Sequence, residues 1–164
     1  MDTVRNSDLD AIDQRLLDIL QGDSALTNQA LAERVHVSPP TCLRRVRRLV
    51  AGGWIERQIA IVSPDRLPGL TAIVELTLDQ QGAERLVEFE ARVADEPAVQ
   101  QCYRVASGVD FVLVMRVADM AAYHALVHRL FTAAANVRNL RVFFSVKRAK
   151  FEPRLPLPKT ASVP

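Results

Sequence analysis

Apolar residues recur at helical spacing in the first third of the chain. One run places them three or four positions apart, at Leu9, Ile12, Leu16, Ile19 and Leu20. This spacing predicts an amphipathic helix over about 8–21, which Ser7 or Asp8 can cap. A second helix is predicted to begin at Thr27, which is a suitable N-cap, and to end near 34–35.

A third helix is predicted in the stretch HVSPPTCLRRVRRLV, residues 36–50. Ser38 can cap it, and Pro39 and Pro40 are tolerated in a first turn, where the N–H that proline lacks has no partner. The predicted apolar stripe consists of Cys42, Leu43, Val46, Leu49 and Val50. The predicted opposite face carries Thr41, Arg44, Arg45 and Arg48, with Arg47 at its flank. Two short helices joined by a short turn, the second of them basic outside, indicate a helix-turn-helix.

Charge is distributed unevenly along the chain. Residues 1–33 contain seven acids and two bases, a net charge of −5, whereas residues 34–58 contain six bases and one acid, a net charge of +5. Such a basic block matters more for nucleic-acid binding than the total charge of +2. In a helix-turn-helix the start of the second helix meets the base edges. We therefore expect Ser38, Pro40, Thr41, Arg44 and Arg45 to approach bases, and Arg47 and Arg48 to contact phosphates.

The remaining two thirds of the chain alternate between strand and helix patterns. Strands are predicted in TAIVELTL, AVQQCYRVA, DFVLVMRV and LRVFFSVK, and helices over 81–95 and 119–133. The order is βαββαβ, that of the ferredoxin-like fold, so the chain as a whole is α+β. Helices cover one sheet face in that fold. The other face offers apolar side chains at Ile73, Tyr103, Val112, Val114 and Phe143, which predicts a second copy packed sheet against sheet.

The sequence resembles the Lrp/AsnC family of transcriptional regulators. The resemblance is carried by LDAIDQRLLDIL, LAERVHVSPPTCLRRVRRL, GWIERQIAIVSP and VASGVDFVLVMRVADMAAY, in the family's order. It implies dimers that assemble into octamers and an amino acid or similar small molecule as effector. It also places the effector site around Ser107, Gly108, Val109 and Asp110, with Met120 and the last strand (Phe143, Phe144, Ser145) nearby, at an interface between dimers. Two positions depart from the family's pattern: His36 stands where glycine is common, and the family's Gly-x-x-Asp loop reads SGVDF.

These patterns divide the chain into four parts. We expect a helix-turn-helix (winged-helix-like) domain over 1–53, a connecting strand or hinge over 54–68, a ferredoxin-like domain over 69–150 and an extended or disordered tail over 151–164. The expected function is sequence-specific, effector-modulated DNA binding. The alternative is a low-specificity protein that wraps DNA and organises the nucleoid without an effector. Asp110 is expected either to bind an α-ammonium group or to cap its hairpin.

Other functional classes find little support in the sequence. It shows no paired carboxylates, nucleophile–base pair or phosphate loop, so we expect neither an enzyme nor a cofactor. His124 and His128 have metal-compatible spacing, but no third ligand follows, so no metal site is expected. The first residues lack the apolar stretch of a signal peptide, and no apolar run is long enough to span a bilayer, so we expect neither. Cys42 and Cys102 resemble apolar fillers rather than a disulfide. We therefore expect a cytoplasmic, nucleoid-associated protein.

Overall fold

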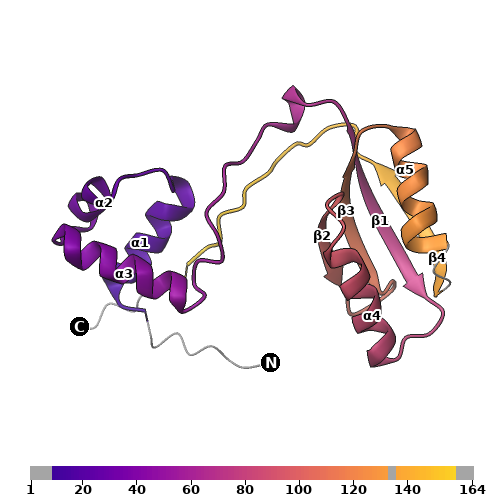
Figure 1. The fold of residues 1–164 in the computed structure, drawn as a ribbon, viewed down its shortest axis with the longest axis horizontal. Coiled ribbons are helices and arrows are strands. Elements are labelled where there is room, and N and C mark those ends of the chain that lie inside the picture. Colours follow the sequence, from indigo (N-terminus) through magenta and orange to yellow (C-terminus); the bar gives the residue numbers. More distant parts are fainter. Residues whose placement is uncertain (1–8, 133–135, 158–164) are drawn as a thin grey trace. The chain divides into compact units, whose positions relative to one another are not determined.

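The computed structural model describes residues 9–132 and 136–157 (Figure 1). The chain divides into two compact units. The first combines the chain up to Ile61 with the segment that begins at Lys150, and the second runs from Val62 to Ala149. Each unit has its own cluster of buried apolar side chains. Within the described residues, no helix is long and apolar enough to cross a membrane.

The first unit contains three helices, α1 (Ala11–Gly22), α2 (Asn28–Val35) and α3 (Pro39–Ala51). Thr27 and Ser38 cap α2 and α3 through their hydroxyls, and the two prolines form the first turn of α3, as predicted. The predicted caps of α1, Ser7 and Asp8, lie outside the described residues. Asp10 caps it instead: its carboxylate accepts the N–H groups of Ile12 and Asp13, both at 2.9 Å.

The turn between α2 and α3 explains how His36 replaces glycine. His36 adopts the left-handed conformation, with φ 57° and ψ 48°. Its N–H donates to Glu33 O, and the N–H of Val37 donates to Ala32 O at 3.1 Å. This is the Schellman pattern of helix termination, which satisfies otherwise unpaired carbonyls. Histidine tolerates the left-handed region better than most residues, and these bonds hold it there at a conformational cost.

The connecting segment after α3 differs from the sequence prediction. Residues 55–63 form no strand, and only a short 3-10 turn, η2 (Pro64–Arg66), interrupts the segment before the second unit. A strand needs a partner for its backbone groups, and this segment pairs with no other described residue of the chain. Its apolar side chains Ile59, Ile61 and Val62 are exposed.

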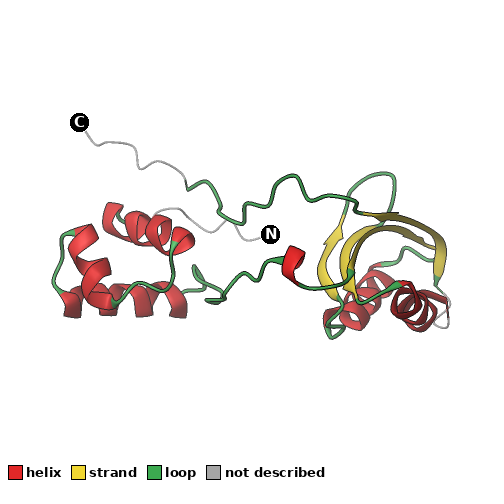
Figure 2. Ribbon diagram, turned by 90° about the horizontal axis from the view of Figure 1, so that it is seen from above, coloured by secondary structure: helices red, strands yellow, loops and turns green. Residues whose placement is uncertain are grey.

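The second unit is one antiparallel sheet covered on one face by helices. Its elements are β1 (Leu70–Leu78), α4 (Ala83–Ala94), β2 (Val99–Arg104), β3 (Phe111–Val117), α5 (Met120–Val127), a π-helical turn (His128–Thr132) and β4 (Val137–Phe144). The strand order is β2-β3-β1-β4, which confirms the ferredoxin-like arrangement. Figure 2 shows both helices on the same side of the sheet. Ala72, Val74, Leu76 and Leu78 of β1 face them and are fully buried, as their alternation predicts.

The open face of the sheet has one apolar row across three strands, beside the Glu75–Arg141 ion pair. Register places Phe143 of β4 beside Ile73 of β1, and Ile73 beside Val114 of β3. Tyr103 of β2 pairs with Val112 in the neighbouring row. Ile73, Tyr103 and Phe143 expose 38%, 53% and 47% of their surfaces. The apolar open face expected from the sequence is therefore present in the chain.

Candidate nucleic-acid interface and effector site

The outward face of α3 carries unpaired arginines. Arg44 and Arg47 are exposed, and neither has a hydrogen bond or ion pair to a described residue. At the start of the helix the Ser38 and Thr41 hydroxyls lie 2.8 Å apart and hydrogen-bond to each other, beside exposed Pro40. Like charges on neighbouring turns repel. This face is therefore suited to an anionic partner, and it can supply both charge and directional donors.

The structure places Arg45 differently from the expected base contact. Its side chain is only 17% exposed and turns towards α1, where Nη1 donates to Asp10 Oδ2 at 2.6 Å and to Asp13 Oδ1 at 2.9 Å. Arg45 lies three positions after Cys42 and four before Leu49, both fully buried. Helical spacing therefore directs it to the flank of the packed stripe. In this structure Arg45 fastens α3 to α1.

The two carboxylates of this cluster, Asp10 and Asp13, differ in burial, since half of the Asp10 side chain is exposed. The Asp13 side chain is fully buried; besides Arg45 it accepts from Arg48 Nη2 and, at 3.3 Å, from the backbone N–H of Asp10. Burial tends to raise the pKa of Asp10, but hydrogen bonds from the Asp13 N–H and from Arg45 outweigh it, so that pKa lies below its ordinary value. The hydrogen bonds to Asp10 and Asp13 raise the pKa of Arg45. These shifts keep Asp10 and Arg45 charged, as an ion-paired cluster between the two helices requires.

Three further positions on α3 refine the predicted surface. Arg48 contacts Asp13 but remains 53% exposed, so part of its guanidinium faces solvent. Leu43 and Val50, expected in the apolar stripe, are instead 40% and 50% exposed. Leu43 adjoins Arg44 on the outward side, where an apolar side chain suits a thymine methyl group. The sequence analysis placed Leu43 in the apolar stripe and not on the outward face. Its position directly after Cys42, about 100° further around the helix, would have indicated its exposure.

The loop Ser107–Asp110, where the resemblance places the effector site, returns to the end of β1. Gly108 has a φ of 86°, which favours glycine, and the turn returns the chain to Asp110. Asp110 Oδ2 accepts the N–H of Leu78 at 2.7 Å and the Gln81 side-chain amide at 3.2 Å. Its backbone N–H donates to Leu76 O at 3.0 Å. Asp110 therefore caps this end of the sheet in the single chain, and its Oδ1 makes no hydrogen bond within the described residues.

The other expected effector residues lie at the opposite end of the sheet. Ser145 donates its N–H to Thr71 O at 2.9 Å, and Phe144 pairs with Ala72. Met120 starts α5 just after Val117, whose partner is Leu70. The loop group, Ser107–Asp110, instead adjoins Leu78, roughly 20 Å along β1 at a rise of ~3.3 Å per residue. One chain therefore does not bring Met120, Phe143, Phe144 and Ser145 together with the loop.

Two family models match the chain, and together they cover most of it. A winged helix-turn-helix DNA-binding model matches residues 9–56, and an Lrp/AsnC ligand-binding domain model matches residues 71–155. The first match contains all three helices of the first unit. The second contains the sheet except Leu70, the first residue of β1, and both of the helices that cover it.

Several known proteins are similar along nearly their whole length. The leucine-responsive regulatory protein of Salmonella typhimurium is 35% identical over 149 residues, 90% of this chain and 91% of that protein. A crystal structure of an AsnC family transcriptional regulator from Agrobacterium tumefaciens superposes with a TM-score of 0.81 at 32% identity, covering 90% of this chain and 97% of that one. A transcriptional regulator of Neisseria meningitidis in complex with L-methionine has a TM-score of 0.77 at 30% identity, covering 90% and 96%.

Proposed function

The chain belongs to the Lrp/AsnC family of transcriptional regulators, and we propose that it reads double-stranded DNA through the outward face of α3. The observation that carries this proposal is the pair of exposed, unpaired arginines, Arg44 and Arg47, on a helix whose first turn Ser38 caps. In the major groove, phosphates and guanine edges would neutralise charges that repel one another in water. Proteins of this family are regulators rather than enzymes.

The side chains of α3 divide into three roles. Ser38, Pro40, Thr41 and Arg44 would approach base edges, since a recognition helix presents its N-terminal residues to the bases. Arg47 and the exposed part of Arg48 would contact phosphates. Arg45 holds the helix in place and is not assigned to a base. The low-specificity architectural alternative is not favoured, because the relatives with which the chain aligns are regulators.

Footprinting on genomic fragments distinguishes these two functions. We expect discrete protected sites, repeated at about one helical turn of DNA, because paired helix-turn-helix units of an oligomer read half-sites on one side of the duplex. The measurement is nuclease protection across a range of protein concentrations in fixed salt. Uniform protection along every fragment, with no preferred sites at low occupancy, would identify the architectural function instead.

Self-association follows from the open sheet face. Ile73, Val114 and Phe143 form a continuous apolar row, and contiguous exposed apolar surface in a protein calls for a partner. A second copy is the natural occupant in a family that the resemblance associates with dimers and octamers. An oligomer would also bring together the two groups of proposed effector residues, which lie apart in one chain. A loop of one copy can meet Met120 and the end of β4 from another only in an oligomer.

The proposed effector is an amino acid or a closely related small molecule. One similar regulator was solved with L-methionine, and the second unit matches the family's ligand-binding domain. Asp110 offers the free Oδ1 to an α-ammonium group while Oδ2 stays bonded to Leu78. Gly108 leaves space beside the backbone, since no described residue beyond its chain neighbours lies within 4 Å of where a side chain would begin. That opening allows a ligand to approach the loop closely.

Isothermal calorimetry with the twenty amino acids tests the effector site, with light scattering on the same samples. For the amino acid that binds, we expect Asp110→Asn to weaken affinity by about tenfold to a hundredfold, because a charge-assisted hydrogen bond is lost while the amide oxygen can still accept from Leu78. Asp79→Asn, which removes a neighbouring carboxylate without described side-chain bonds, is the control. Heat from none of the twenty would exclude amino-acid effectors, and equal losses in both variants would remove Asp110 from the site.

A further inference from the structure

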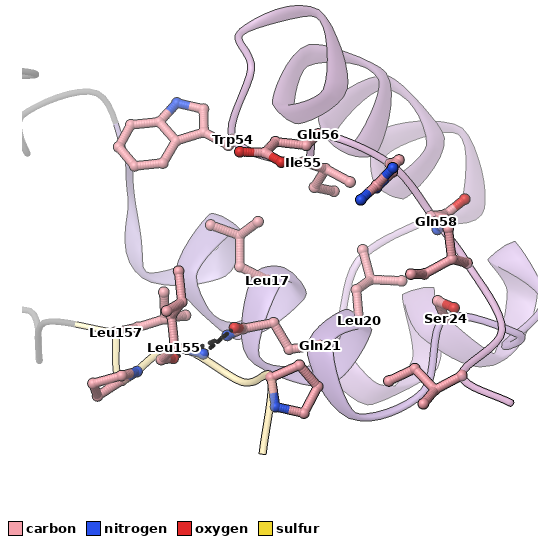
Figure 3. Close-up of a pocket in the computed structure, with 15 residues that line it drawn as sticks. Leu17, Leu20, Gln21, Ser24, Trp54, Ile55, Glu56, Gln58, Leu155 and Leu157 are labelled. Carbon is pink, nitrogen blue, oxygen red and sulfur yellow. Dashed lines mark hydrogen bonds between the residues drawn. The ribbon is translucent and has the colours of Figure 1, made fainter. Parts of the chain in front are cut away.

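The C-terminal segment lies against α1 instead of extending freely. Figure 3 shows Leu155 and Leu157 beside the helix, with hydrogen bonds joining Gln21 to Leu155. Gln21 Oε1 accepts the N–H of Leu155 at 2.6 Å, and Gln21 Nε2 donates to the Leu155 carbonyl at 3.2 Å. One side-chain amide thus satisfies both backbone polar groups of one tail residue. Such two-point recognition fixes the register of the segment on the helix.

Charge and packing reinforce this register on either side of Leu155. Arg154 Nη2 lies 3.2 Å from Asp18 Oδ1. The guanidinium of Arg154 also lies beside Gly22, which follows Asp18 by one turn of α1. Leu157 packs against the buried cluster of the helix-turn-helix unit. Contacts of three different kinds therefore lie within four consecutive residues. A segment without a specific binding site would not be expected to make hydrogen bonds, an ion pair and apolar contacts within so few residues.

Proline suits the segment to this binding mode. Pro153 and Pro156 restrict the backbone to extended conformations, which lowers the entropy lost when the segment is ordered. Both prolines, together with Leu155 and Leu157, line a cavity of about 440 Å³ whose other walls include Leu17, Leu20 and Trp54. The segment therefore forms part of the wall of a mainly apolar groove on α1, whose lining also includes the polar residues Gln21, Ser24, Glu56 and Gln58.

We propose that this groove on α1 is a dedicated docking site for the chain's own segment 152–157, which gives the helix-turn-helix unit a second attachment to the rest of the chain. The first attachment is the connecting segment after Trp54; the second is the return of the chain after β4. Within the described residues, the hydrogen bonds and ion pairs of the docked segment join it to α1 and not to α3. Docking therefore leaves Arg44 and Arg47 free.

The chain's only tryptophan reports on docking. Trp54 lines the same cavity as the tail, so loss of the tail should expose it to water. In a chain that ends at Phe151 we expect red-shifted Trp54 emission, stronger acrylamide quenching and a fall of about 4–8 °C in the melting midpoint of this unit. A chain that ends at Leu157 retains every described tail contact and should match the full chain. These measurements need no DNA and no effector, so they are independent of the proposed function.

A mutant cycle separates docking from a general effect on α1. Gln21→Ala should lower the midpoint in the full chain, although alanine is the better helix former. In the chain that ends at Phe151 the same substitution should not lower the midpoint, because its partner is already absent. Lys150→Gln, outside the docked residues, should behave as the unsubstituted chain. Equal effects of Gln21→Ala with and without the tail, or unchanged Trp54 emission in the chain ending at Phe151, would overturn the proposal.

Discussion

Replacing Asp13 with alanine is expected to lower the free energy of unfolding of the helix-turn-helix unit by about 3–5 kcal/mol. The Asp13 side chain is fully buried and accepts from Arg45, Arg48 and the backbone of Asp10. Arg48 can turn to solvent once the carboxylate is gone. Arg45 cannot do so readily, because its side chain is only 17% exposed and its buried Nε already lacks a described partner. The largely buried guanidinium would keep its ion pair with the half-exposed Asp10 but lose its fully buried partner.

Urea denaturation followed by far-UV circular dichroism measures this loss. Arg47→Ala is the matched control on the same helix pair, because it removes an exposed arginine without described partners and should change stability by no more than about 0.5 kcal/mol. Asp13→Leu combined with Arg45→Met should recover part of the loss, since apolar replacement of both partners removes the stranded charge. A loss below about 1 kcal/mol for Asp13→Ala would show that Asp10 and water compensate the charge of Arg45 without Asp13.

The same cluster shows why the sequence predicted the helices better than their surfaces. Apolar spacing, Thr27 and Ser38 located the helices and two of their caps, because these features depend on local backbone chemistry. The charge pattern did not indicate that Arg45 is ion-paired within the unit whereas Arg44 is exposed. Their difference depends on a partner thirty-two residues away, Asp13, whose acidic side chain lies in the buried stripe of another helix. Local patterns contain no information on such pairing.

Three other differences between the sequence prediction and the structure also depend on contacts between residues far apart in sequence or in different chains. The connecting segment was expected to be a strand or a hinge, and strand formation requires a neighbour that the described residues do not supply to it. The sequence predicts an extended or disordered tail; its described part, 151–157, forms no helix or strand, and its docking depends on Gln21, a residue far away in sequence. The expected effector residues divide between two ends of the sheet, and the resemblance places their site at an interface between dimers, which a single chain does not contain. The βαββαβ order was predictable, since alternation along each strand is local.

Substituting Arg44 is expected to change specificity, whereas substituting Arg48 or Arg47 is expected to change affinity. Arg44 is exposed one turn from the capped start of α3, within reach of base edges, and has no described partner to release. A bidentate arginine–guanine contact contributes about 1–3 kcal/mol of discrimination. Arg44→Ala should therefore reduce the ratio of specific to random DNA binding by about tenfold to a hundredfold.

Arg47→Ala and Arg48→Ala should weaken binding to specific and random DNA by similar factors and should each reduce the salt slope of log K by about one. Fluorescence anisotropy with a footprinted site and a scrambled duplex, over a series of salt concentrations, measures both quantities. Glu33→Gln, on the neighbouring helix α2, controls for a general change in surface charge. Equal losses on both duplexes for Arg44→Ala and Arg48→Ala would contradict this division of roles, because direct base readout and phosphate contact differ in how they depend on sequence.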